Sequence, residues 1–345
     1  MNTFTNAKVI QTAADAALYH AQTAERGTLG FQVSQGMLRE FDRCPLRWVR
    51  GYTPPDGKAK AWGSMLDCLL LTPEEFEWRY PLRPDTYPAP ATHEKVKKGL
   101  ITAGDPLPWN ANAAICKEWE ATMEGRSTIK SATLFDLQQS VKRLRADAAI
   151  EDVLGASANQ VWVRADYHDA ATGLVIPCKG LIDGVPFPGT PVLEHCLWDL
   201  KSTRSALPEA WVKWVYQTGL HVQAAWYLDM YNAATGEERS TWLWILQENF
   251  PPWEVGRRMA SQAFIELGRL FYRSALARYA KCLSTGVWPG YDSIPGQRQS
   301  LGGWTDVVPL QWMLDRGLDH MGAATEEAAE EDDSDPEMPE GEVTP

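Results

Sequence analysis

The sequence predicts an α/β fold in which a central sheet is flanked by helices, with a helical portion before the sheet. Apolar runs of strand length recur in the second half of the chain and alternate there with segments of helical periodicity. The first half shows helical patterns joined by loops rich in proline, glycine and lysine. With 44% hydrophobic residues and 16 tryptophans, the chain has the composition of a protein with a substantial core.

The helical portion is expected over residues 31–150. Ser34 is a candidate cap for its first helix, because a serine oxygen can accept a hydrogen bond from the opening turn. The segment 81–108 is rich in Pro, Lys and Gly and is expected to form a long loop, a kind of segment that is usually functional or disordered. Four helices are expected, at 34–50, 61–71, 109–124 and 132–150.

The sheet core is expected over residues 155–290. Long helices are predicted at 207–233 and 260–286, the second ended by a Pro-Gly pair. Because no linker separates two self-contained halves, a single domain is predicted over 31–300, after an N-terminal arm at 1–30 and before a C-terminal extension at 301–325. Five strands are expected, at 160–168, 174–186, 196–202, 240–247 and 253–259.

The net charge of −12 is concentrated at the C-terminus. Residues 326–342 hold ten acids and no base, which leaves about −2 on the rest of the chain. The segment 326–345 is therefore predicted to be an acidic disordered tail. Two interpretations stay open for it, a solubilising tail or a DNA mimic that weakens non-productive binding.

Several classes of protein are disfavoured by composition. No run approaches the 18 apolar residues of a membrane span, and the N-terminus lacks the apolar core of a signal peptide. The six cysteines are widely spread, without the paired spacing of a zinc ribbon or an iron–sulfur cluster. Reduced thiols in a cytosolic protein are the simplest explanation.

Two carboxylates and a lysine form the main chemical pattern. Asp183 and Asp199 stand 16 residues apart in apolar runs that read as strands able to pair, and Lys201 follows the second acid by two residues. Residues two apart in a strand share a face, so Asp199 and Lys201 are expected side by side. Two carboxylates suit a hard cation such as Mg²⁺, and a neighbouring lysine can position water or stabilise charge on a phosphate. The pattern indicates metal-assisted hydrolysis of a phosphodiester.

An ordinary explanation competes with this one. An Asp-x-Lys pattern is common on solvent-facing sheets, where both side chains are simply hydrated. Leu197, Trp198 and Leu200 favour a buried strand instead, and buried charges are rare unless they are paired or bound to metal.

A second pair of polar residues lies in the helix expected after the Asp-x-Lys strand. Gln223 and Tyr227 are four residues apart and share a helical face, so they can contact a phosphate or the lysine. By spacing alone Tyr227 is more typical of a core aromatic, and Tyr216 is expected to pack in the core or at its rim.

Several segments in this order resemble the PD-(D/E)XK nuclease superfamily, and most closely the RecE-type exodeoxyribonucleases of bacteria, phages and prophages. The resemblance spans about 34–290 and implies a restriction-endonuclease-like core with a central mixed β-sheet. The matching segments are Ser34–Pro45, Gly63–Phe76, Pro108–Asn110 with Cys116–Trp119, Lys179–Asp183, Trp198–Thr203 and Gln223–Tyr227, with Trp242–Glu248 and Pro251–Val255 fitting the same layout.

The resemblance implies a role for each residue of the main pattern. Asp183 and Asp199 resemble the metal-binding carboxylates, and the carbonyl of Leu200 would be a further ligand. Lys201 resembles the catalytic lysine that positions or activates water.

The resemblance also assigns the helix pair and reveals one departure. Gln223 and Tyr227 resemble the supporting motif near the scissile phosphate. Many relatives have a histidine where this chain has Asp67. An aspartate there can bind a cation, alter the metal preference, lower the activity or change the local geometry, and a plain helix-capping or solvated residue is the alternative.

The resemblance implies a Mg²⁺-dependent exonuclease, with Mn²⁺ as a substitute, that acts on linear double-stranded DNA. It would degrade one strand 5′ to 3′ and leave 3′ single-stranded ends for recombination by a single-strand annealing protein. A ring-shaped homo-oligomer in the cytoplasm of a bacterium or a phage-infected cell is expected. The alternatives are an endonuclease of the same fold, including a spacer-processing enzyme, and a non-catalytic DNA-binding or scaffold protein.

Overall fold

The computed structural model divides the chain into two units, residues 1–288 and 289–345. In the second unit, β10 (Gln299–Leu301) pairs antiparallel with β11 (Trp304–Thr305). The tail at 326–345, predicted to be disordered, lies outside the described part of the chain. The structure describes residues 4–11, 19–21, 24–55, 57–191, 193–291, 299–301 and 304–305.

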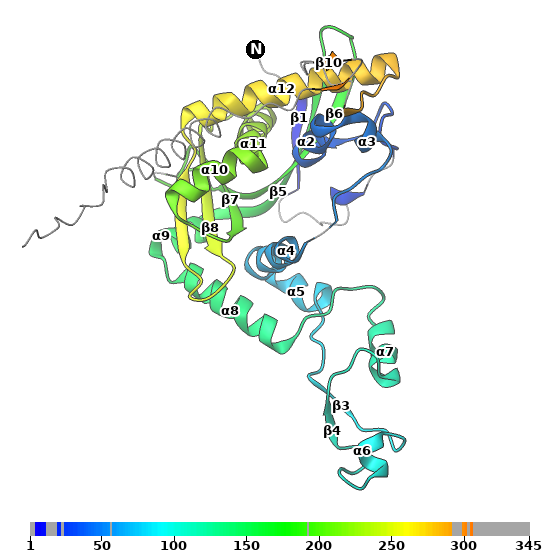
Figure 1. Cartoon of the computed structure of the whole chain (residues 1–345). Coiled ribbons are helices and arrows are strands. Elements are labelled where there is room, and N and C mark those ends of the chain that lie inside the picture. Colours follow the sequence, from blue (N-terminus) through cyan, green and yellow to red (C-terminus); the bar gives the residue numbers. More distant parts are fainter. Residues whose placement is uncertain are drawn as a thin grey trace, which may run out of the picture. The chain divides into compact units, whose positions relative to one another are not determined.

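The first unit is built on a mixed sheet flanked by helices, which confirms the predicted fold class (Figure 1). The pair β7–β8 is parallel and the other neighbours on the main path are antiparallel. The short strand β2 (Val33–Ser34) adds a parallel pair with β6. The order across the sheet is β1 (Phe4–Gln11), β5 (Ser157–His168), β6 (Val175–Pro186), β7 (Cys196–Thr203), β8 (Thr241–Glu248) and β9 (Val255–Met259).

The crossover between the parallel strands β7 and β8 contains two helices, α10 (Pro208–Thr218) and α11 (Leu220–Thr235). The prediction of one continuous helix at 207–233 is therefore wrong. Gly219 separates the two helices in a left-handed conformation with φ of 73°, and its amide closes α10 on the carbonyl of Tyr216. Glycine adopts this conformation without the steric cost of a side chain, so the chain turns here.

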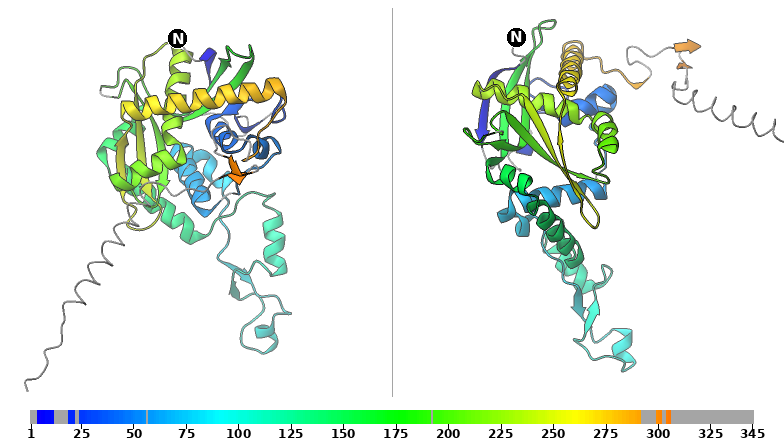
Figure 2. Two further views of the ribbon diagram at one scale, coloured as in Figure 1. Left: turned by 45° about the horizontal axis from the view of Figure 1, so that its top comes forward. Right: turned by 90° about the vertical axis from the view of Figure 1, so that its left-hand side faces the viewer.

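Helices cover both faces of the sheet (Figure 2). Leu197 and Trp198 are fully buried neighbours on β7, and they belong to the cores on opposite faces. One core packs α11 and α12 (Gln262–Thr285) against the sheet. The other core includes α4 (Lys58–Leu71), α8 (Ser131–Arg145) and α9 (Ala148–Gly155).

The helix expected at 34–50 is interrupted. Ser34 caps α2 (Gln35–Arg43) as predicted, since its hydroxyl accepts a hydrogen bond from the Met37 amide at 3.4 Å. Cys44 is extended and α3 (Pro45–Val49) begins at the next residue. Proline disfavours helical backbone in the residue before it, and this explains the break.

The segment expected to be a loop at 81–108 has structure of its own. It follows α5 (Pro73–Arg79) and holds the antiparallel pair β3 (Thr86–Pro88) and β4 (Pro106–Pro108), with the short α6 (Glu94–Lys97) between them. Together with α7 (Ala114–Ala121) it forms a small separate core, and the views show it apart from the sheet (Figures 1 and 2). That core consists of Tyr87, Ala89, Leu107 and Cys116.

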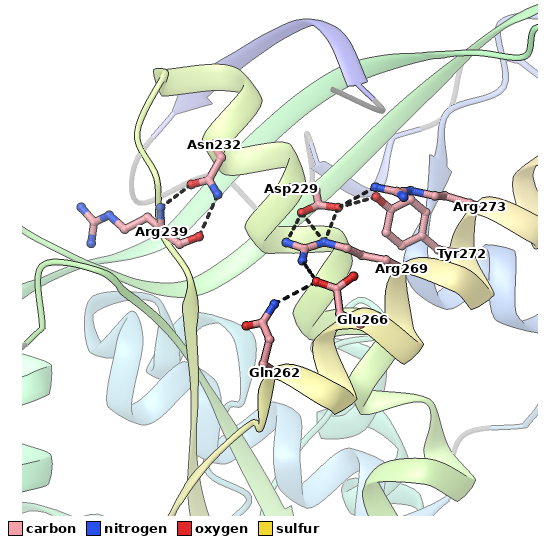
Figure 3. A network of polar contacts seen from close by, with 8 residues as sticks. All are labelled: Asp229, Asn232, Arg239, Gln262, Glu266, Arg269, Tyr272 and Arg273. Atoms are coloured by element: carbon pink, nitrogen blue, oxygen red, sulfur yellow. Dashed lines mark hydrogen bonds and ion pairs between the residues drawn. The ribbon is translucent and has the colours of Figure 1, made fainter. Parts of the chain in front are cut away.

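A partly buried polar network holds helix α11 against α12 (Figure 3). The carboxylate of Asp229 accepts hydrogen bonds from the Arg269 guanidinium at 2.7 Å and from the Tyr272 hydroxyl at 2.5 Å. The helices also cross closely, because a Cβ on Gly268 would lie 2.1 Å from the His221 carbonyl oxygen. This contact requires glycine and holds α11 in place against the sheet.

Among the described residues, no helix is both long and apolar enough to cross a membrane.

Candidate active site

The candidate site lies where β6 and β7 separate. Their register contains one pair, Gly184 with Trp198, and a Cβ on Gly184 would lie 1.8 Å from the indole. Beyond this pair, Oδ2 of Asp183, the residue next to Gly184, accepts a hydrogen bond from the backbone amide of Leu200 at 2.9 Å. The Asp183 carboxylate therefore accepts the β7 amide that a backbone carbonyl of β6 would accept in a regular sheet. The predicted pairing of β6 with β7 is restricted to the register at Gly184 and Trp198.

Asp199 and Lys201 lie side by side on β7, as the alternation of a strand requires. Lys201 Nζ is 2.5 Å from Asp199 Oδ2 and donates a hydrogen bond to the Leu200 carbonyl at 3.3 Å. The amide of Gln223 donates to Asp199 Oδ1 at 3.1 Å. With 1% of its surface exposed, Asp199 is a buried carboxylate whose position is determined by these partners.

Burial and neighbouring charges shift the pKa values of Asp199, Asp67 and Lys201. Burial raises the pKa of Asp199 to about 7, with Asp183 adding to the rise and Lys201 opposing it. Burial also raises the pKa of Asp67, and the charge of Asp183 raises it further. For Lys201 burial alone would lower the pKa, but Asp199 and Asp183 outweigh burial and raise it. Lys201 is therefore held as an ammonium ion among acids that gain from a cation.

Tyr227 packs under the site rather than into it. Its ring lies on Gly180, where a Cβ would be 2.9 Å from the ring, and 5.7 Å from the ring of Trp242. Burial, followed by the charges of Asp199 and Asp183, raises the pKa of its hydroxyl. Tyr227 is thus a neutral core aromatic close enough to be affected by the charges of both carboxylates, and its role near a scissile phosphate stays a prediction.

Tyr216 departs from its prediction. It is 55% exposed, and its ring stacks on His221 with centroids 5.6 Å apart. The expectation that it packs in the core or at its rim is wrong, because Trp211 and Val215 are the α10 residues that face inward.

A cavity of about 200 Å³ adjoins the carboxylates. Asp67 on α4 and Asp183 on β6 line it together, so the helix expected at 61–71 does bring Asp67 to the site. Arg79 and His20 line the same cavity. Glu75, which lines it as well, pairs with Arg79 at 3.3 Å, and burial lowers the pKa of His20. Arg79 is therefore the cationic group of this cavity, and a guanidinium can hold a phosphate oxygen.

One residue of the site was not predicted from the sequence. Gln160 lines the cavity, and its amide donates a hydrogen bond to Asp183 Oδ1 at 3.3 Å. The register pairs Asn159 with Gly184 and Val161 with Ile182 without a shift, so Gln160 lies directly opposite Asp183. Its φ of 50° is unusual for a residue other than glycine and interrupts the regular ladder at this one position. No composition or spacing signal in the sequence marks this backbone conformation.

The residues present fit a hard cation. Asp183, Asp199, Asp67 and the Leu200 carbonyl offer only oxygen donors. Asp199 Oδ2 is buried, and its close cationic partner is Lys201 Nζ at 2.5 Å. The described residues contain no group of three or more His, Cys, Asp or Glu side chains that is close enough to form a complete metal site. The fit therefore rests on the nature of the donors and on the mutual repulsion of the acids.

A mixed sheet that opens at two carboxylates, with a lysine beside one of them, defines the PD-(D/E)XK class of nuclease folds. The model of a family described as "PDDEXK-like domain of unknown function (DUF3799)" matches residues 37–295, and the chain belongs to that family. Among curated proteins none matches at a significant level.

Solved structures agree on the fold. The crystal structure of a protein from Eubacterium rectale, described there as a "Putative exonuclease", is similar over 87% of this chain and 97% of its own, with a TM-score of 0.51 and 13% identity. At that identity the likeness shows the fold alone. Family and fold together support a hydrolytic nuclease, and nucleases of this class typically use divalent metals.

Proposed function

We propose that the protein is a Mg²⁺-dependent deoxyribonuclease that degrades linear double-stranded DNA from its ends. The convergence of Asp183, Asp199 and Lys201 at the gap between β6 and β7 is the observation that supports this proposal most directly. The proposed metal ligands are the two carboxylates, the Leu200 carbonyl and Asp67. Mg²⁺ is proposed because oxygen donors suit a hard cation, and Mn²⁺ accepts the same donors.

The chain's own groups have distinct proposed roles. A bound cation would polarise the scissile phosphate and lower the pKa of a water molecule. Lys201, favoured as an ammonium ion by its raised pKa, would hold the attacking water and stabilise charge on the phosphate. Gln223 orients Asp199 through the 3.1 Å hydrogen bond, and Gln160 does the same for Asp183 at 3.3 Å.

The finer parts of the proposal rest on the resemblance to RecE-type enzymes. We propose cleavage of one strand in the 5′ to 3′ direction, which leaves 3′ single-stranded ends for recombination. A single-strand annealing protein would receive those ends, and a homo-oligomeric ring would enclose the duplex. Support comes from matching segments in the same order over about 34–290.

The test uses linear duplex DNA, labelled at either the 5′ or the 3′ end, and covalently closed circular DNA, each with Mg²⁺ or EDTA. We expect loss of linear DNA alone, only with Mg²⁺, and release of the 5′ label before the 3′ label. Nicked circles would show an endonuclease instead. No reaction with any substrate would favour a non-catalytic DNA-binding protein.

Two kinds of variant test the site itself. Asp183→Asn and Asp199→Asn should abolish cleavage, because each removes an anionic ligand while nearly preserving the side-chain shape. Lys201→Ala should slow cleavage about 10²-fold, a typical effect of losing one positioned charge. Its Mg²⁺ affinity, measured by calorimetry, should not fall, because lysine is no ligand. Near-parental cleavage by either asparagine variant would contradict the site assignment.

A further inference from the structure

A second cavity, of about 690 Å³, lies between α9 and the last two strands of the sheet. It shares no lining residue with the cavity beside Asp67. Its volume is typical of a ligand or peptide site. Most of its wall is apolar and belongs to the core on the α8–α9 face, namely Ile150, Val153, Leu193, Leu243 and Ile245.

The outer wall of this cavity is β9. Leu243 pairs with Met259 and Ile245 with Arg257, so these four side chains share one face of the sheet. Met259 is 68% exposed, which is unusual for a large apolar side chain in a strand. The cavity is therefore a groove open to solvent along β9.

β9 is also an unpaired edge. It stands at one end of the sheet order, and no other strand in the described part of the chain pairs with it. The Ala260 amide bonds to the Trp242 carbonyl and the Glu248 amide bonds to the Glu254 carbonyl, both at 2.9 Å. Residues of an antiparallel strand alternate between bonding to the partner strand and facing away from it. Because Glu254 and Ala260 bond to β8, the backbone groups of Arg257 and Met259 face away from β8.

The charges on β9 favour a particular occupant. Side-chain exposure of Arg257 is 62%, and its one ion pair, with Asp147, is long at 3.6 Å. Arg258 follows it, but its guanidinium donates to the carbonyls of Arg257 and Ala206, so Arg257 carries the exposed charge of this strand. Two copies of β9 paired antiparallel about Arg257 would place this residue opposite itself, and like charges in that position destabilise a sheet. An acidic segment of a different protein has the complementary charge.

We propose that β9 and this cavity, together called the β9 groove, bind an extended segment of another protein. The segment would add a strand to the β9 edge through the outward Arg257 amide and the outward backbone of Met259, since Arg258 already donates to the Arg257 carbonyl at 2.8 Å. Alternate side chains of a strand share a face, so an apolar side chain of the segment would enter the cavity beside Met259. An acidic residue of the segment would lie opposite Arg257 on the same face. This binding is separate from the proposed nuclease reaction.

The test is direct selection of peptides. A phage-displayed library of random peptides about eight residues long, enough to span an edge strand, is panned against the full-length protein without DNA or metal. Enriched peptides should carry an apolar and an acidic residue two positions apart, because Met259 and Arg257 share one face of the sheet. Ala149→Trp places an indole in the groove and should weaken their binding at least about 10-fold. The matched control is Ala148→Trp on the same helix, because Ala148 is exposed and does not line the cavity; this variant should bind like the parent.

A second variant covers the case in which Ala149→Trp does not fold. Arg257→Glu changes an exposed side chain and should reject the acidic peptides. Thermal melting checks that each variant is folded, independently of nuclease activity. Absence of any common enriched sequence, or equal binding of enriched peptides to both groove variants, would overturn the proposal. Duplex DNA binding that is lost in Arg257→Glu, without peptide enrichment, would assign the surface to nucleic acid instead.

Discussion

The side-chain amide of Gln223 donates a 3.1 Å hydrogen bond to Oδ1 of Asp199 and thereby joins α11 to a buried carboxylate of β7. Gln223→Leu keeps the size of the side chain and removes the donor. We expect cleavage to slow by about 10- to 100-fold, a typical effect of losing a residue that orients a metal ligand. Steady-state cleavage of labelled linear duplex measures this.

The control for that variant is Gln217→Leu, an exposed change on α10 that should leave the rate unaltered. Titration with Mg²⁺ separates two causes of a slow Gln223→Leu enzyme. Recovery at high Mg²⁺ would mean weakened cation binding, and a deficit that persists would mean misplaced chemistry. Parental activity at all Mg²⁺ concentrations would show that Asp199 needs no such support.

Stability of the metal-free protein should depend on pH through Asp199. Burial raises its pKa from an ordinary 3.8 to about 7. Between those values the folded state binds more protons than the unfolded state, so stability falls as pH rises. Thermal melts in EDTA at about pH 5 and about pH 8 should show this loss, and Asp199→Asn should show less of it.

Added Mg²⁺ should reverse the trend, since the cation binds the ionised carboxylate. The rise in melting temperature that Mg²⁺ produces should be larger at the higher pH. A parent and an Asp199→Asn variant with the same pH dependence in EDTA would show that Asp199 titrates normally.

Asp67 is expected to take part in cation binding, because it lines the cavity with Asp183 and that acid raises its pKa. Asp67→Ala should weaken Mg²⁺ binding and slow cleavage, though less than Asp199→Asn. Asp67→His should be tolerated and should shift the preference from Mg²⁺ towards Mn²⁺, since imidazole suits softer cations. Activity profiles with both metals test this. Glu74→Ala, an exposed acid on α5, is the control, and parental profiles for both Asp67 variants would place Asp67 outside the site.

The sequence predicted well where the local pattern and the packing agree. Asp183 and Asp199 lie in apolar runs, and a strand that is apolar on both faces has its place in the middle of a covered sheet, as β6 and β7 do. Alternation along β7 then placed Lys201 beside Asp199, where the structure has it. Helical spacing likewise placed Gln223 and Tyr227 on one face of α11.

The sequence predicted poorly where tertiary contacts decide. The turn at Gly219 interrupts an apolar pattern that continues in helical period across it, so periodicity alone could not separate α10 from α11. The gap between β6 and β7 depends on the Asp183 carboxylate accepting the Leu200 amide, a contact between residues 17 apart in the sequence. Exposure of Tyr216 depends on which side of α10 meets the sheet.

Gln160 has a strained backbone and also contacts Asp183, so substitutions there should change both stability and the rate of DNA cleavage. It lies opposite Asp183 on β5 with φ of 50° and donates a hydrogen bond to that carboxylate. Left-handed backbone costs a residue with a side chain roughly 1 kcal/mol more than glycine. Gln160→Gly and Gln160→Ala both remove the amide, and only the glycine relieves the strain.

Both variants should therefore cleave DNA more slowly than the parent, by about 10-fold or more, because Asp183 loses its orienting donor. In chemical denaturation, however, Gln160→Gly should be more stable than Gln160→Ala by about 1 kcal/mol. Gln160→Asn, which tolerates left-handed backbone and carries a shorter amide, should resemble the glycine variant in stability. Parental cleavage rates for the glycine and alanine variants would show that the amide does not position Asp183. An alanine variant as stable as the glycine variant would show that the left-handed backbone at this position carries no strain.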